Sequence, residues 1–126
     1  MARNDGYVFQ LDAGGRTAIK EEMRAILIQF ARQGETITYS DLSLRLQYAP
    51  LHPHSFLFSH ILRDICREEE TAGHGQLCAL VVSKTTGMPG GGYFRRDIWH
   101  NLETDDLETM WRSELESVFD YWQNAE

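Results

Sequence analysis

Apolar residues in the first third of the chain recur at the spacing of a helix. They predict one helix over residues 17–33, whose buried face would consist of Ile19, Met23, Ile26, Leu27 and Phe30. Gly34 comes next and predicts the end of this helix, because glycine readily adopts the left-handed conformation that closes helices. Ahead of it, residues 7–11 form a short run typical of a strand, which Gly14 and Gly15 would end.

A short second helix is predicted to begin near Thr38. The Thr38 side chain can accept a hydrogen bond from a free amide at the helix start, and Asp41 three residues later can answer it. Pro50 and Pro53 then break the pattern, because proline lacks an amide donor and restricts the residue before it.

A third helix is predicted from about Ser55 to a stop at Gly73. Its apolar stripe consists of Phe58, Ile61, Leu62 and Ile65. The run at residues 67–70 is charged throughout, so we expect the end of this helix to be solvated.

A hairpin is predicted after the third helix. Residues 77–82 form a continuous apolar run that is short and rich in branched side chains, as in a buried strand. Residues 83–92 hold four glycines and one proline and therefore must turn. Tyr93 and Phe94 would then pair back as the second, antiparallel strand, which gives a wing with a glycine-rich tip.

The last helix has the longest pattern in the chain. Asp105 is placed to cap the start of this helix, and the Glu108 side chain can accept the reciprocal hydrogen bond from the Asp105 amide. Its apolar stripe consists of Leu107, Met110, Trp111, Leu115, Val118 and Trp122. Tryptophan side chains bury large areas, so we expect this helix to pack against the rest of its own domain.

The order of these elements is typical of a winged helix. We therefore expect a helix-rich α+β fold, a single winged-helix-type domain over residues 1–126, with three helices, a β-hairpin wing and a long amphipathic C-terminal helix. A chain of 126 residues with 42% apolar and 25% charged residues has the size and balance of one globular domain.

The net charge of −7 is concentrated at one end. Residues 1–101 carry eleven basic and eleven acidic side chains, whereas residues 102–126 hold eight acids against Arg112 alone. We expect residues 103–126 to form an acidic helix with a solvated face. Two sharper alternatives are a surface that binds a partner and one that keeps polyanions away.

The sequence favours a cytoplasmic protein without a membrane segment. No apolar run approaches the roughly 20 residues that span a bilayer, and the first residues lack the apolar stretch of a secretory signal. In a reducing cytosol Cys66 and Cys78 would remain thiols, and their place inside regular segments predicts that they are buried and inert.

We expect no cofactor, no metal and no enzymatic activity. His52, His54 and His60 lie close in sequence and could form an open zinc site, but no acidic residue lies among them and we favour ordinary histidines. No serine or cysteine lies in a nucleophile elbow. The glycine-rich run 87–92 lacks the Lys-Ser or Lys-Thr of a phosphate-binding loop.

Residues 37–42, Ile-Thr-Tyr-Ser-Asp-Leu, resemble a known signature. They are similar to the Thr-Tyr-x-x-Leu motif in the winged-helix half of alkylguanine-DNA alkyltransferases and alkyltransferase-like proteins. The resemblance covers about a third of the chain and implies that Tyr39 lies at the DNA backbone. The Pro-Cys-His-Arg or Pro-Trp-His-Arg run of that family is absent, so alkyl transfer is not implied.

The chain as a whole resembles a group of small uncharacterised bacterial and phage proteins. The shared marks are Ile37-Thr38-Tyr39, residues 77–82 with Lys84, Thr86-Gly87-x-Pro89-Gly90, Tyr93-Phe94, Trp111, Glu114-Leu115 and Tyr121-Trp122. This second resemblance spans most of the sequence and implies no particular activity.

Two functions remain open after these observations. The first is a regulatory protein that associates weakly with duplex DNA, through Tyr39, Arg45, Arg63, Arg67, Lys84, Arg95 and Arg96. The second is a protein–protein interaction module that uses the acidic C-terminal helix as its docking surface. A balanced body with an acidic tail attracts DNA only weakly, so we expect such binding to be very sensitive to salt.

Overall fold

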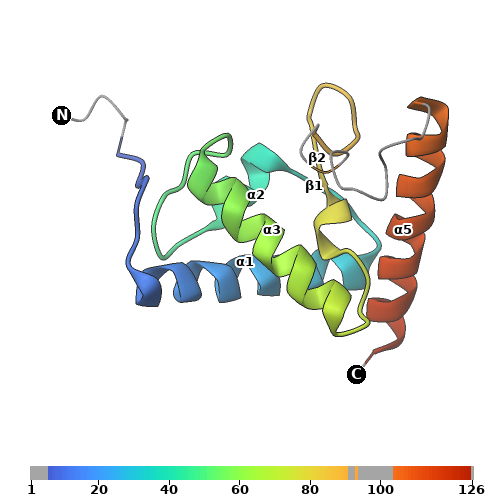
Figure 1. Cartoon of the computed structure of the whole chain (residues 1–126), viewed down its shortest axis with the longest axis horizontal. Coiled ribbons are helices and arrows are strands. Elements are labelled where there is room, and N and C mark those ends of the chain that lie inside the picture. The colour runs from blue at the N-terminus through green and yellow to red at the C-terminus, as the bar shows by residue number, and fades with distance from the viewer. Residues whose placement is uncertain (1–5, 91–92, 94–103, 126) are drawn as a thin grey trace.

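The computed structural model describes residues 6–90, 93 and 104–125, the side chains of 104–106 excepted, and is rich in helix (Figure 1). In chain order its elements are α1 (Ala13–Gln33), β1 (Ile37–Thr38), α2 (Tyr39–Arg45), α3 (Phe56–Thr71), the 3-10 helix η2 (Leu77–Leu80), β2 (Val81–Val82) and α5 (Thr104–Asn124). The mixture of helices with a small sheet agrees with the α+β class. Among the described residues, none of the helices combines the length and apolar character that crossing a membrane requires.

Helix α1 begins earlier than the apolar pattern predicts. The Asp12 side chain accepts a hydrogen bond from the Gly15 amide at 2.7 Å, so both glycines lie in the first helical turn. Residues 7–11 are not a strand, and in that segment the Val8 amide donates to the Pro50 carbonyl at 2.8 Å. The cap at Asp12 outweighs the low helix propensity of the two glycines. The predicted stop is confirmed, because Gly34 has a φ of 72°.

The starts of α2 and α3 are confirmed at the residues that the sequence predicts. The Asp41 amide donates to the Thr38 hydroxyl at 3.1 Å, and the Phe58 amide donates to the Ser55 hydroxyl at 3.2 Å. In both cases a hydroxyl oxygen satisfies an amide that has no partner inside the helix. Helix α3 ends at Thr71, two residues before Gly73.

The predicted antiparallel hairpin is wrong. Residues 77–80 form η2, and β2 pairs in parallel with β1, with Ile37 opposite Val81 and Thr38 opposite Val82. Tyr93 is helical, and Phe94 lies outside the described residues. A short apolar run is equally compatible with a buried helical turn and a buried strand. Here the apolar side chains of residues 77–80 are buried by a helical turn. Parallel strands need a long crossover connection, and here α2 and α3 belong to the connection between β1 and β2.

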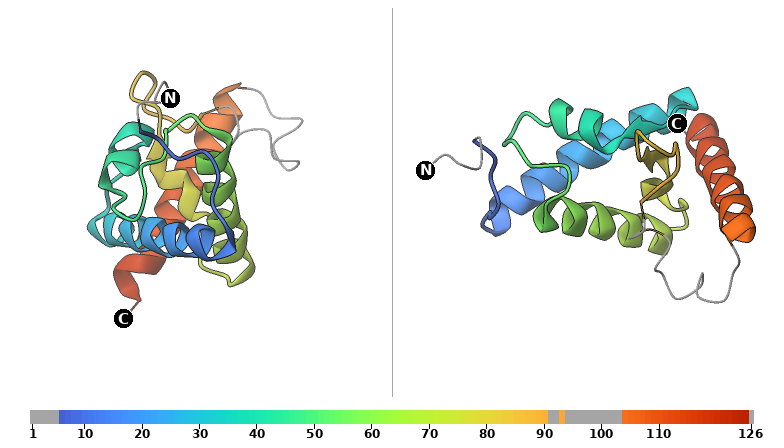
Figure 2. Two further views of the ribbon diagram at one scale, coloured as in Figure 1. Left: turned by 90° about the vertical axis from the view of Figure 1, so that its left-hand side faces the viewer. Right: turned by 90° about the horizontal axis from the view of Figure 1, so that it is seen from above.

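The core surrounds η2. Leu77 and Leu80 are fully buried, and η2 contacts α1, α3 and α5. Figure 2 shows α1 and α3 running along the length of the molecule and α5 packed across one end. A second apolar cluster lies beside the main core and consists of Ala79, Val82, Tyr93 and Trp111. The segment that leads into β2 is therefore held from three sides.

Helix α5 packs on its own domain through part of the predicted stripe. Trp111, Val118 and Trp122 are buried, as expected. Met110, in contrast, is 40% exposed and does not belong to the buried stripe. The helix begins at Thr104, and the predicted cap by the Asp105 side chain lies outside the described residues. Glu108 accepts a hydrogen bond from Arg112 at 2.9 Å.

Candidate functional site

A cavity of about 720 Å³ opens between α3, the start of α2 and the loop after β2. A volume of this order is typical of sites for small organic ligands, which span about 300–1,000 Å³. The residues that line it are Thr38, Tyr39, Ser40, Pro53, His54, Ser59, Leu62, Arg63, Cys66, Arg67, Glu70, Cys78, Ser83, Lys84, Thr85, Gly90 and Tyr93. The cavity therefore brings together segments that lie far apart in the sequence.

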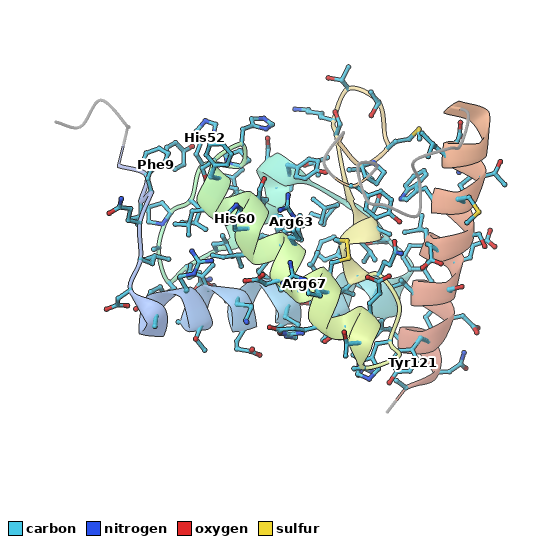
Figure 3. The ribbon with its side chains drawn as sticks, in the orientation of Figure 1. Phe9, His52, His60, Arg63, Arg67 and Tyr121 are labelled. Atoms are coloured by element: carbon cyan, nitrogen blue, oxygen red, sulfur yellow. A yellow bond between two sulfur atoms is a disulfide. The ribbon has the colours of Figure 1, made fainter. Side chains whose placement is uncertain are left out.

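Three cations surround this cavity. Arg63 and Arg67 lie one helical turn apart on the exposed side of α3, where Figure 3 shows both side chains, and Lys84 follows β2 on the opposite side. Arg67 has only a long ion pair, 3.7 Å to Asp64. Within the described residues, Arg63 and Lys84 have neither an ion pair nor a hydrogen bond from the side chain. Glu70 is the one acidic residue among the described residues that line the cavity.

A tight turn holds Lys84 at the cavity. The Ser83 amide donates to the Met88 carbonyl, and the Gly87 amide donates to the Ser83 carbonyl, both at 2.8 Å. Gly87 has a φ of 73°, a left-handed conformation that favours glycine. The turn closes on itself, so the position of Lys84 depends on that of Ser83 at the end of β2.

The Tyr39 hydroxyl fixes the far end of this loop. It accepts a hydrogen bond from the Gly90 amide at 2.8 Å, and the ring packs edge-on against Phe58 with centroids 6.5 Å apart. Burial raises the pKa of Tyr39, and the hydrogen bond from Gly90 opposes that shift. A side chain at Gly90 would place its first carbon 3.3 Å from the hydroxyl oxygen, so this close approach favours glycine. Tyr39 therefore connects α2 to the loop that carries Lys84.

Cys66 and Cys78 form a disulfide in the cavity lining, which contradicts the expected thiols. Their Cα atoms are 5.2 Å apart, within the usual range for a disulfide. The bond joins α3 to η2 across twelve positions of sequence. Sequence reasoning missed this pair because it inferred the redox state from the compartment, and neither residue has a spacing that signals its partner.

The predicted nucleic-acid contacts divide between three places. Tyr39, Arg63, Arg67 and Lys84 all line the cavity. Arg45 lies elsewhere, with its guanidinium carbon 4.9 Å from the centre of the Phe30 ring. Arg95 and Arg96 lie outside the described residues.

A second charged cluster joins α1 to the end of α3. Arg24 is hydrogen-bonded to Glu68 and Glu69, and Lys20 donates to Glu68 at 2.6 Å. Burial opposes the charge of Arg24, but these hydrogen bonds raise its pKa, while those from Lys20 and Arg24 lower the pKa of Glu68. The charged end of α3 is thus not uniformly solvated, since Glu69 is 6% exposed and also contacts the His74 ring nitrogen at 2.8 Å.

The histidines near α3 make local contacts. The His54 amide donates to the His52 ring nitrogen at 3.0 Å, and the His60 ring faces Phe56 with centroids 6.3 Å apart. In the part of the chain that the structure describes, no three metal-ligating side chains come together.

Comparison with known proteins finds no relative of this chain. No protein-family model, no curated protein and no solved structure matches the chain.

Proposed function

We propose that the cavity side of this protein binds the phosphate backbone of duplex DNA, as a non-catalytic module of the winged-helix type with a regulatory role. One observation carries the proposal: Arg63, Arg67 and Lys84 come from two elements and line one cavity. Cations from separate elements that converge on one side can contact successive phosphates along a strand. The cluster of Arg24 offers no such surface, because its charges are already paired.

The arrangement of α2 and α3 supports this orientation. Helix α2 is followed by a proline-containing loop over residues 46–55 and then by α3, whose outward side carries both arginines. In helix-turn-helix proteins the second helix of such a pair enters the major groove. In this proposal α3 is that helix, and the turn after β2 replaces the hairpin as the element that contacts the flanking backbone.

Tyr39 has an indirect part in this proposal. Its hydroxyl already accepts a hydrogen bond from Gly90, so it positions the loop of Lys84. A phosphate oxygen could still accept the remaining hydroxyl proton, because a tyrosine both donates and accepts.

The binding is weak and electrostatic. Each phosphate that a protein neutralises contributes about −0.9 to the slope of log affinity against log salt concentration. Three contacts therefore give a slope of about −2.7, or a loss of roughly 40-fold in affinity between about 50 and 200 mM salt. The net charge of −7 further disfavours approach to DNA.

Fluorescence anisotropy of a labelled duplex over a range of salt concentrations tests the proposal. Replacing Arg63 or Lys84 by glutamine should weaken binding and make the salt slope shallower by about 0.9 in each case. Arg45→Gln is the matched control, because it removes the same charge from an exposed position away from the cavity. Equal effects of Arg45→Gln and Arg63→Gln would contradict the assignment of the cavity.

The acidic helix offers the alternative function. Trp111, Val118 and Trp122 are buried against its own domain, while Glu116 and Asp120 are exposed and available to a protein partner. No binding to duplex DNA even at about 20 mM salt would overturn the DNA proposal and favour this interaction module.

A further inference from the structure

The Cys66–Cys78 disulfide lies where a small molecule in the cavity can reach it. Both cysteines line the cavity together with Arg63 and Arg67, and Figure 3 shows the disulfide as a yellow bond beside α3. Cys66 is 1% exposed, whereas Cys78 is only half-buried. A reagent that enters the cavity therefore meets Cys78 more readily than Cys66.

The charges around the disulfide select the kind of reagent. Arg63 and Arg67 precede and follow Cys66 on α3, and Lys84 lies on the other side of the cavity. Among the described residues of the lining, these three cations are accompanied by one carboxylate, that of Glu70. A cleft with an excess of one sign of charge concentrates small ions of the opposite sign.

We propose that this disulfide is an exchange site for small anionic thiols, which form a mixed disulfide with Cys78. The cavity volume of about 720 Å³ admits a thiol that carries carboxylate or sulfonate groups. The same cations lower the free energy of the attacking thiolate, which is the reactive form in disulfide exchange.

The reaction balances in two steps. The thiolate of the small molecule attacks the Cys78 sulfur, a new bond forms between those two sulfurs, and the Cys66–Cys78 bond breaks. The electron pair leaves on the Cys66 sulfur, which takes a proton from solvent. A second small thiolate then attacks its counterpart in the mixed disulfide, which releases Cys78 as a thiolate and an oxidised small disulfide. Two small thiols are oxidised and one protein disulfide is reduced.

Competing thiols of opposite charge test this proposal. The oxidised protein is treated at about pH 8 with 2-mercaptoethanesulfonate, which is anionic, or with cysteamine, which is cationic, and rates are expressed per concentration of thiolate. After the remaining thiols are alkylated, mass spectrometry of peptides locates the mixed disulfide. Each thiol's rate with the protein is divided by its rate with a small uncharged disulfide. We expect this ratio to be about tenfold larger for the anionic thiol than for the cationic thiol. We also expect the adduct to lie on Cys78.

Two double variants separate the local charges from the net charge. Arg63→Gln with Lys84→Gln should abolish the preference for the anionic thiol, while Arg16→Gln with Arg45→Gln removes the same charge outside the cavity lining and should preserve it. Both members of the first pair are exposed, and circular dichroism verifies that the variants fold. The proposal is overturned by an adduct on Cys66, by absence of exchange, or by a preference that survives in the first variant. None of these outcomes depends on DNA binding.

Discussion

Trp111 joins the last helix to the segment that leads into the cavity. Its side chain is 3% exposed, and its ring nitrogen donates a hydrogen bond to the Ala79 carbonyl at 2.9 Å. Ala79 belongs to η2, directly before β2 and the turn of Lys84. One side chain therefore provides both buried area and a partner for a buried carbonyl, each of which stabilises the fold.

Truncation of Trp111 should be strongly destabilising. We expect Trp111→Ala to lower the free energy of unfolding by about 3–5 kcal/mol, because it leaves a large cavity and a carbonyl without its donor. Met110→Ala is the control, since the neighbouring Met110 is 40% exposed and should change stability by less than about 0.5 kcal/mol. Urea denaturation followed by circular dichroism measures both. Equal stabilities of the two variants would show that α5 does not pack through Trp111.

The residues of the candidate site were partly predictable, because the positive charge of arginine and lysine can be identified from the sequence. Arg63 and Lys84 were chosen from sequence because they lie on the third helix and the expected hairpin, the elements that a winged helix presents to nucleic acid. The same reasoning included Arg45, yet that guanidinium lies over the Phe30 ring. It also treated Glu69 as solvated, although Arg24 holds it in a buried ion pair. Such partners come from α1, and one-dimensional spacing contains no information about them.

Elements with local signals were predicted better than those with distant partners. The helix starts at Thr38 and Ser55 and the stop at Gly34 depend on contacts within a few residues, and all three are confirmed. The sheet was predicted wrongly because Val81 pairs with Ile37, far back in the chain, and each strand has only two residues. An apolar run as short as residues 77–82 carries no period that separates a helical turn from a strand.

The disulfide between α3 and η2 is the covalent link between these elements, and its removal should be measurable. Closing a loop of this length restricts the unfolded chain by roughly 3 kcal/mol in the entropic model. The two cysteines are twelve positions apart. We expect reduction to lower the free energy of unfolding by about that amount.

Equilibrium unfolding in urea, with and without a phosphine reductant, measures this difference. A double variant, Cys66→Ala with Cys78→Ala, serves as the control because reductant has no bond to break in it. A stability that is identical in the oxidised and reduced wild-type protein would show that the bond contributes nothing to folding.

At the scale of the whole molecule, the cavity lining and the last helix differ in the sign of their charge. The cavity lining holds an excess of cations, whereas Glu116 and Asp120 are exposed on α5. The sequence predicts this difference, since all of the acidic excess lies after residue 101. It does not predict that the apolar side of α5 covers η2.

The acidic side of α5 should oppose DNA binding at low salt. Replacing Glu116 by glutamine and Asp120 by asparagine changes the net charge from −7 to −5, because two negative charges are removed. We expect the affinity for a labelled duplex to rise by about two- to fivefold at about 20 mM salt, where charges act across roughly 20–30 Å. At about 500 mM salt the screening length is only several ångströms, so the difference between variant and wild type should vanish. Anisotropy titrations at both salt concentrations measure the effect.

Both side chains are exposed, so unchanged unfolding in urea verifies that the variant is folded. A gain in affinity that persists at high salt would contradict a repulsive field and indicate that these residues contact the duplex directly.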